Sequence, residues 1–366
     1  MAATLNASGS KGCPTHSTYS RCSSWVGSVS IRSREATTRN PHRDIPLGSA
    51  GMALWDDELE ALRPKLREEA ATFIASVPWQ ETATATSSLE ERVAAHRKVS
   101  LGGPPSDRAV DRTIEGPAGP IRLRVFEHEQ PDGVLLHIHG GAWMAGTPEM
   151  MDLLHEVIVD KCNVSVVSVD YRLAPEHPYP AGSDDCEAAA CWLLEHGFEE
   201  FGSDRLLIAG ESAGAHLASV TLLRMRDKHR AADRFLGANL VFGAYDLSRT
   251  PSQRGVGITA GTDILDGTGF PLDLYLPGMS EEERRDPDIS PLYADLGGMP
   301  DALFSVGSND HLLDDTLFMA ARWEAAGNRS ELLVYPDTPH GCIALPSVAA
   351  HFFPRLFDFL GHCLDR

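Results

Sequence analysis

The stretch Gly210-Glu211-Ser212-Ala213-Gly214 lies between two segments of different pattern. Before it, residues 205–209 form an apolar run short enough to be a buried strand, and after it residues 215–226 carry apolar side chains at helical spacing. A serine in a sharp strand-to-helix turn, with a glycine two residues away on each side, is typical of a nucleophile elbow. Larger side chains at those two glycines would collide with the strand and the helix. The pentapeptide alone also fits a turn without chemistry, so the rest of the chain must decide.

Length and composition limit the classes of function. The 366 residues are 42% apolar, enough for one large α/β domain with insertions or for two ordinary domains. The net charge of −20 disfavours nucleic acids and anionic membranes as partners. No run of 18 apolar residues occurs, so we expect no membrane span. The seven cysteines show no metal-ligand spacing, which favours reduced thiols in a cytoplasmic protein without cofactor.

The first 51 residues differ from the remainder. They are rich in serine, threonine and arginine, and Glu35 and Asp44 are their only acidic residues. Because this composition offers little apolar surface to bury, we predict a disordered N-terminal extension over residues 1–51. A transit peptide, or an upstream start with Met52 as the working initiator, would also account for the composition.

Strand-like and helix-like segments alternate along the rest of the chain. This alternation predicts an α/β fold, with a mostly parallel central sheet covered by helices on both faces. We expect Pro64 to kink or split the first helix and Ser183 to cap the N-terminus of another. The expected strands are residues 110–115, 121–127, 134–139, 164–169, 205–209, 238–242, 303–306 and 332–335. The expected helices are residues 54–74, 148–162, 183–196, 215–226, 316–326 and 348–360.

Acyl transfer by a serine needs a base and an acid that orients the base. His340 follows the last expected strand, and Asp310 follows the strand before it. Active sites of open α/β sheets lie at such carboxyl ends, so these two residues are the candidate base and acid. Asp314 and Asp315 are expected instead to cap the next helix.

A glycine pair, Gly140 and Gly141, directly follows the expected strand 134–139. Without side chains, its backbone N–H groups can approach a substrate oxygen, so this loop is the candidate oxyanion hole. His137 and His139 are expected to hydrogen-bond within the same loop. We predict no metal site there, because no carboxylate or cysteine joins the two histidines at ligand spacing.

Four blocks together resemble the bacterial hormone-sensitive-lipase-like carboxylesterases and lipases of the α/β-hydrolase superfamily. They are His139-Gly140-Gly141-Ala142-Trp143, the stretch Asp170–Ala181, Gly210–Gly214, and the pair Asp310 and His340. The resemblance covers roughly residues 52–366 and implies an α/β-hydrolase domain. It also implies a helical cap from about residues 52–80 and 246–290, which covers the acyl site and limits substrate size.

The resemblance assigns roles to individual residues. It implies Ser212 as nucleophile, Asp310 as acid and His340 as base. It implies an oxyanion hole made by the N–H groups of Gly141, Ala142 and Ala213. There are two departures from the family pattern. Ala142 stands where a third glycine is commoner, which keeps a backbone donor but should narrow the pocket slightly. Cys342 stands where phenylalanine often follows His-Gly, so the resemblance does not define the shape of the acyl pocket.

Other residues near these motifs are expected to support the site without reacting. Glu211 should orient the elbow, and His139 and Gly140 should shape the oxyanion loop. Arg172 and Glu176 should hold a loop beneath the oxyanion strand.

The resulting expectation is a serine ester hydrolase that acts on short to medium acyl esters through an acyl-enzyme. A small-molecule ester is the expected partner, and a homodimer is allowed for. The alternatives are a non-catalytic ligand-binding homologue and an amidase.

Overall fold

The structure is a computed structural model that describes residues 54–76, 88–98, 103–255 and 270–366. All of these residues belong to one unit of the chain, Thr38–Arg366. The extension predicted over residues 1–51 lies outside the described residues, as does part of the predicted cap segment.

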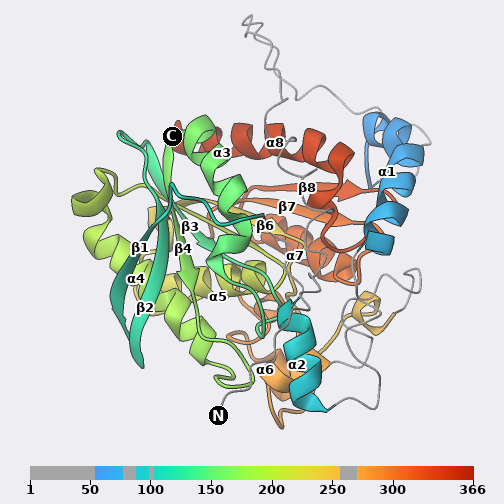
Figure 1. Ribbon diagram of the computed structural model, residues 1–366, viewed down its shortest axis with the longest axis horizontal. Helices are drawn as coiled ribbons and strands as arrows, with labels where there is room; N and C mark the ends of the chain where they lie inside the picture. Colours follow the sequence, from blue (N-terminus) through green and yellow to red (C-terminus); the bar gives the residue numbers. More distant parts are fainter. Residues whose placement is uncertain (1–53, 77–87, 99–102, 256–269) are drawn as a thin grey trace, which may run out of the picture. The chain divides into compact units, whose positions relative to one another are not determined.

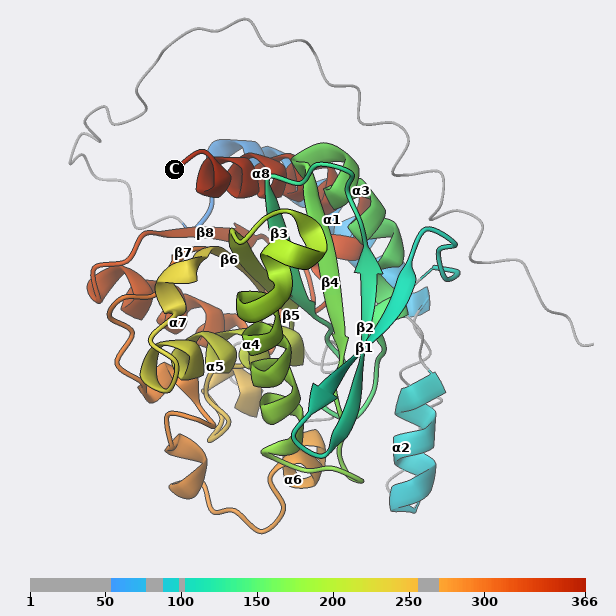
Figure 2. The same ribbon diagram turned by 90° about the vertical axis from the view of Figure 1, so that its left-hand side faces the viewer.

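An eight-stranded sheet forms the centre of the described chain, in the order β1-β2-β4-β3-β5-β6-β7-β8 (Figures 1 and 2). The β1–β2 and β2–β4 pairs are antiparallel, and all other pairs are parallel. All eight predicted strands are present, with ends that differ by at most three residues. Their bounds are β1 Val110–Gly116, β2 Gly119–Phe126, β3 Gly133–Ile138, β4 Val164–Asp170, β5 Leu206–Glu211, β6 Phe235–Val241, β7 Asp301–Gly307 and β8 Ser330–Tyr335.

Helices cover both faces of the sheet, as predicted, because the central strands are apolar on both sides. Every residue of β3 and β5 is buried. One face carries α1 (Asp57–Ser76), α3 (Asp152–Cys162) and α8 (Pro346–Leu364), and the other carries α4 (Ala181–Phe201), α5 (Ala213–Asp227) and α7 (Leu313–Ala325). The buried apolar residues of the described chain form two main clusters, one for each set of helices.

The register of the parallel strands places the site. Ile138 at the end of β3 pairs with Gly210 near the end of β5, so the loops after both strands leave the sheet at the same edge. Strands β7 and β8 also run parallel to β5, so the loops that follow them leave at this edge too. The predicted nucleophile, acid, base and oxyanion loop are therefore brought to one edge of the sheet.

Two predictions about helix capping are wrong. Ser183 lies inside the first turn of α4, whose N-cap is Pro180, and its hydroxyl faces that of Tyr275 at 3.1 Å. Asp314 and Asp315 lie in the first turn of α7, but neither side chain caps that helix.

Both carboxylates instead hold the loop that follows β6. Asp315 is fully buried and accepts the backbone N–H groups of Tyr245 and Asp246 and the hydroxyl of Thr250. Asp314 accepts the backbone N–H of Ser252. These contacts depend on tertiary structure, which helix-capping rules do not consider.

Pro64 lies within α1, which continues through it, so the first helix is not split. A short helix that was not predicted, α2 (Leu89–Lys98), packs Val93 in a small cluster with Met144 and near Leu274 of α6 (Phe270–Tyr275). The short 3-10 helices are η4 Pro148–Met151, η5 Ala232–Arg234, η6 Ser252–Arg254, η7 Glu283–Arg285, η8 Pro291–Tyr293 and η9 Cys342–Ala344. None of the helices in the described ranges combines the length and the apolar character needed to cross a membrane.

Candidate active site

The turn between β5 and α5 holds Ser212 in a strained backbone conformation, with φ 56° and ψ −118°. A Cβ on Gly210 would lie 2.4 Å from the carbonyl carbon of Gly214, and a Cβ on Gly214 would lie 2.0 Å from the carbonyl oxygen of Ile138. Both glycines are thus required by close backbone contacts, as the sequence predicted. Strain of this kind in a non-glycine residue is characteristic of functional sites.

The predicted nucleophile, base and acid form a continuous hydrogen-bonded series. Nε2 of His340 lies 3.0 Å from the Oγ of Ser212, within hydrogen-bonding distance. Nδ1 of His340 lies 2.9 Å from Oδ2 and 3.1 Å from Oδ1 of Asp310. Because a carboxylate only accepts, Nδ1 carries the ring proton when His340 is neutral, which leaves Nε2 free to accept the proton of Ser212.

Asp310 is completely buried, whereas the His340 side chain keeps 11% of its surface exposed. Burial alone would raise the pKa of Asp310, but the facing His340 and the backbone N–H of Leu312, 2.8 Å from Oδ1, hold that pKa below its ordinary value. The acid therefore stays ionised and can stabilise a positive charge on His340.

The candidate oxyanion loop after β3 has positive φ angles at three consecutive residues. In this conformation its backbone N–H groups do not continue the hydrogen bonding of the sheet. Gly141, Ala142 and Trp143 have φ values of 127°, 54° and 60°. Within the part of the chain that the structure describes, the backbone N–H groups of Gly141, Ala142 and Ala213 have no hydrogen-bond acceptor. Free N–H groups in two loops at one edge of the sheet suit a developing oxyanion.

Side chains from three directions fix this loop. The hydroxyl of Tyr171 donates to the carbonyl of His139 at 2.9 Å, and Nδ1 of His139 donates to the carbonyl of Gly140 at 2.8 Å. His139 is fully buried, and this burial lowers its pKa to about 4, so its ring stays neutral. Arg97 of α2 donates to the carbonyl of Met144 at 2.9 Å, on the far side of the loop.

Trp143 joins the candidate oxyanion loop to the segment predicted as a cap. Its indole stacks on the ring of Tyr275 and donates to Nδ1 of His216 at 3.0 Å. Since an indole N–H only donates, Nδ1 of His216 must be unprotonated, and Nε2 then donates to the carbonyl of Ile289 at 2.8 Å. Burial lowers the pKa of His216 to about 4, which keeps this arrangement neutral.

Glu211 is buried behind the elbow, and its Oε2 lies 3.0 Å from Nε2 of His137. Nδ1 of His137 lies 2.9 Å from the hydroxyl of Ser168 on β4. A Cβ on Gly140 would lie 2.9 Å from the carbonyl oxygen of Glu211, so the elbow and the oxyanion loop are in close backbone contact. The carboxylate of Glu211 thus contacts His137 on β3, and a supporting role for Glu211 beside the elbow stays a prediction.

The predicted loop contacts are confirmed, and the structure supplies the partners. Arg172 forms a two-pronged ion pair with Asp185 of α4. Glu176 pairs with Arg97 at 2.6 Å. Cys342 is fully buried in the core that contains α1 and α8.

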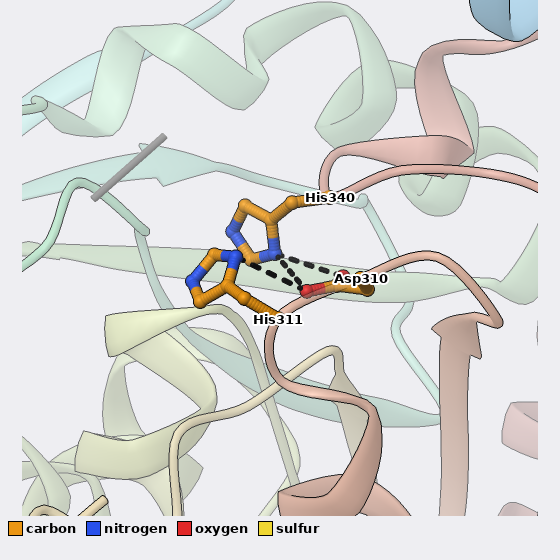
Figure 3. A group of neighbouring side chains, drawn as sticks. All are labelled: Asp310, His311 and His340. Carbon is orange, nitrogen blue, oxygen red and sulfur yellow. Dashed lines mark hydrogen bonds and ion pairs between the residues drawn. The ribbon is translucent and has the colours of Figure 1, made fainter. Parts of the chain in front are cut away.

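A third histidine, His311, accompanies the acid and the base (Figure 3). Its Nδ1 lies 3.5 Å from Oδ1 of Asp310, and its ring centroid lies 4.8 Å from that of His340. One ligand atom from each of the three residues lies within 4.8 Å of the others. Among the described residues this is the one group whose composition and spacing could hold a metal ion.

Several of these residues were not singled out from the sequence. His216 and His311 carry no motif and are distinguished only by their partners in the fold. For α2 a signal was present: Ser88 and Glu91 have capping-box spacing, and in the structure each accepts the backbone N–H of the other, at 3.2 and 2.7 Å.

Comparison with known proteins gives consistent matches. A family described as "alpha/beta hydrolase fold" matches residues 135–344. The chain is 35% identical to the carboxylic ester hydrolase LipN of Mycobacterium tuberculosis, over 64% of this chain and 64% of LipN, slightly under two thirds of each. It is 33% identical to the esterase LipI of the same organism, over 67% of this chain and 78% of LipI.

Among solved structures, a hormone-sensitive lipase from a metagenome library is similar, with a TM-score of 0.63 and 27% identity. The match covers 84% of this chain and 98% of that one.

Proposed function

Because the chain belongs to the α/β-hydrolase fold family, in its hormone-sensitive-lipase-like carboxylesterase branch, we propose that it hydrolyses carboxylic esters at Ser212. The observation that carries the proposal is the hydrogen-bonded series from Ser212 through His340 to the buried Asp310. A nucleophile, a base and an orienting acid in this geometry suit acyl transfer.

The reaction follows from the positions of the hydrogen bonds. Nε2 of His340 takes the Ser212 proton as Oγ attacks the ester carbonyl, and Asp310 stabilises the resulting imidazolium. The carbonyl oxygen becomes an oxyanion facing the N–H groups of Gly141, Ala142 and Ala213. His340 then gives its proton to the departing alcohol, which leaves an acyl-enzyme, and water repeats these steps to release the acid.

For the acyl group we propose short to medium chains. The described part of the cap segment is acidic at its surface, where Glu281, Glu282, Glu283 and Asp286 are exposed. Adsorption to an oil–water surface requires an extended apolar face, which these side chains do not offer. A soluble ester fits this surface better than an emulsified triglyceride.

The two alternatives are less well supported. A non-catalytic ligand-binding homologue has no use for the complete Ser212–His340–Asp310 series. An amidase could use the same series, because the triad histidine can also protonate a departing amine; the ester is preferred because the relatives named above are esterases.

A chain-length series tests the proposal. We expect the ratio kcat/KM for p-nitrophenyl esters, from acetate to palmitate, to peak at short or medium chains.

Substitution of the serine tests the mechanism. Ser212→Ala should lose several orders of magnitude in rate. The control Ser219→Ala removes a hydroxyl that donates to the carbonyl of Ala215 within α5, and this variant should stay active. An organophosphate should add one adduct, on the peptide that contains Ser212. A peak at palmitate with activation by an oil–water surface would overturn the chain-length proposal, and activity in Ser212→Ala would overturn the mechanism.

We further propose a cytoplasmic location, supported by the free thiols of all five described cysteines: Cys162, Cys186, Cys191, Cys342 and Cys363. For the oligomeric state we propose a monomer or a homodimer. Light scattering on the purified chain measures its molar mass in solution and distinguishes the two.

A further inference from the structure

His311 is a buried polar side chain that the proposed reaction does not use. The residue is 2% exposed, and neither ring nitrogen has a hydrogen-bond partner among the described residues. A buried imidazole with both nitrogens unpaired is costly, and such groups in native structures call for an explanation. Oδ1 of Asp310, the acid of the proposed triad, lies 3.5 Å from Nδ1 of His311.

The three side chains in Figure 3 form a donor set. The rings of His311 and His340 lie side by side, and each turns a nitrogen toward Asp310. Two imidazole nitrogens and one carboxylate oxygen are a ligand set that proteins use for Zn²⁺ and similar transition metals. The 3.5 Å between Nδ1 of His311 and Oδ1 of Asp310 is close to the separation of two ligands on one zinc ion, given bonds of about 2.0–2.2 Å.

We propose that Asp310, His311 and His340 form an inhibitory site for Zn²⁺ or a cation of similar preference. This inference rests on the proposed esterase function, since inhibition presupposes the triad. Binding draws the Nδ1 atoms of the two histidines and a carboxylate oxygen of Asp310 onto one ion. The ion and the catalytic hydrogen bonds compete for the same atoms, so binding and catalysis exclude each other.

The position of one proton explains the inhibition. In the active arrangement, neutral His340 carries its proton on Nδ1 and offers the Nε2 lone pair to Ser212. A cation on Nδ1 binds the lone pair of Nδ1 itself, so the single ring proton must move from Nδ1 to Nε2. Nε2 then cannot accept the Ser212 proton, and the base is lost although no covalent bond changes. Neutral imidazoles and an ionised carboxylate bind the ion without net release of a proton.

The donor set also predicts selectivity. Mg²⁺ and Ca²⁺ prefer sites made wholly of oxygen ligands, and a site with two nitrogens disfavours them. Zn²⁺ should therefore inhibit at concentrations where Mg²⁺ and Ca²⁺ have no effect, and a chelator should restore activity.

Inhibition by ZnCl2, measured on a short p-nitrophenyl ester, is the first test. Each variant is normalised to its own rate without metal. His311→Leu and His311→Asn should each require at least about tenfold more Zn²⁺ for half inhibition than the wild type. The matched control is His229→Leu, because His229 is an exposed histidine 3.6 Å from the sulfur of Cys191 and could attract Zn²⁺ by itself. Equal sensitivity of the wild type and both His311 variants, or loss of sensitivity in His229→Leu, would overturn the proposal.

Calorimetric titration of Zn²⁺ into Ser212→Ala separates this inference from the proposed function, because binding needs no turnover. One Zn²⁺ per chain, lost when His311→Leu is added to Ser212→Ala, supports the site even if no ester is hydrolysed. Binding that survives in the double variant rejects the site, whether or not the wild type is an esterase. Circular dichroism at matched concentration checks that the variants are folded. If His311→Leu does not fold, His311→Asn replaces it in the titration.

Discussion

The Nε2 atom of His340 lies 3.0 Å from the Oγ of Ser212, although 128 positions separate the two residues in the chain. The contact exists because β5, β6, β7 and β8 run parallel, so that the loops after β5 and β8 leave the sheet at the same edge. Phe242, directly after β6, packs its ring against that of His340 at 4.6 Å. The position of His340, the proposed base, thus depends on the strands between it and Ser212.

Replacement of Asp310 by asparagine should lower kcat by about 10⁴-fold with little effect on folding. The amide N–H of asparagine, facing Nδ1 of His340, would favour the tautomer with its proton on Nε2, which cannot accept the Ser212 proton. The comparison is Asp314→Asn, four residues away, whose carboxylate contacts Ser252 instead of His340. That variant should keep kcat within a few-fold of the wild type, as steady-state kinetics would measure. Similar losses in both variants would argue against a specific role for Asp310.

Arg97 should control the rate from outside the reacting groups. It donates to the carbonyls of Met144 and Ala174 and pairs with Glu176, so that α2 holds the far side of the oxyanion loop. We expect Arg97→Ala to lower kcat/KM by about 10- to 100-fold, since small displacements of positioning groups are costly in rate. Arg97→Lys should restore little, because an ammonium group cannot reproduce the forked geometry.

The control for Arg97 is Arg108→Ala, which removes a surface pair with Asp160 on α3. It should leave kcat/KM unchanged. Kinetics that are equal in Arg97→Ala and Arg108→Ala would show that α2 plays no part in positioning the loop.

Stability should fall on acidification because buried histidines must take up protons. Burial lowers the pKa of His216 from 6.5 to about 4, so between these values the unfolded chain binds a proton that the folded chain does not. The free energy of unfolding therefore decreases as the pH falls through this window, by about 3 kcal/mol for this residue alone. Well above pH 6.5, from about pH 8, the residue contributes almost no pH dependence, because it is neutral in both states.

Urea denaturation at pH 7.5, 5.5 and 4.5 measures this effect. His216→Leu should be less stable than the wild type at pH 7.5, because it loses the bonds to Trp143 and Ile289. It should also lose less stability on going to pH 4.5. If His216→Leu keeps the wild-type pH dependence, another group is responsible.

Truncation should separate the extension from the domain. Removal of residues 1–50 should leave kcat and the melting temperature unchanged, as expected if this segment contributes no core. Removal of residues 1–74 takes away most of α1, whose Leu66 is fully buried and whose Arg63 pairs with Asp337 at 2.6 Å, just before His340. This longer deletion should lower solubility and alter substrate preference. Loss of folding in the shorter deletion would show that residues 1–50 belong to the domain.

The features that were predicted from the sequence depend on local pattern. Gly210, Gly214 and the apolar segments around Ser212 predict strand, turn and helix within a few residues of chain. Asp310 and His340 could be found because each follows a strand, and parallel strands bring such loops together.

The features that were missed depend on the packed fold. Nothing near His216 in the sequence distinguishes it from other helical histidines, since its partners, Trp143 and Ile289, are 73 residues away on either side. Asp315 was predicted to cap a helix because its position in the sequence fits a cap. In the structure its carboxylate instead accepts backbone N–H groups of the loop after β6. Rules based on local sequence fail where the oxygens of a buried carboxylate accept hydrogen bonds from a segment that is distant in the chain.

The sequential order of β5, β6, β7 and β8 has a consequence for the synthesis of the protein. As the chain leaves the ribosome, the candidate oxyanion loop and the proposed nucleophile Ser212 emerge first, the proposed acid Asp310 follows after β7, and the proposed base His340 arrives only with the loop after β8. During this interval Ser212 has no group that could activate it. The proposed ester hydrolysis can begin only when β8 has docked at the edge of the sheet, so a chain whose translation stops before residue 340 should be inactive.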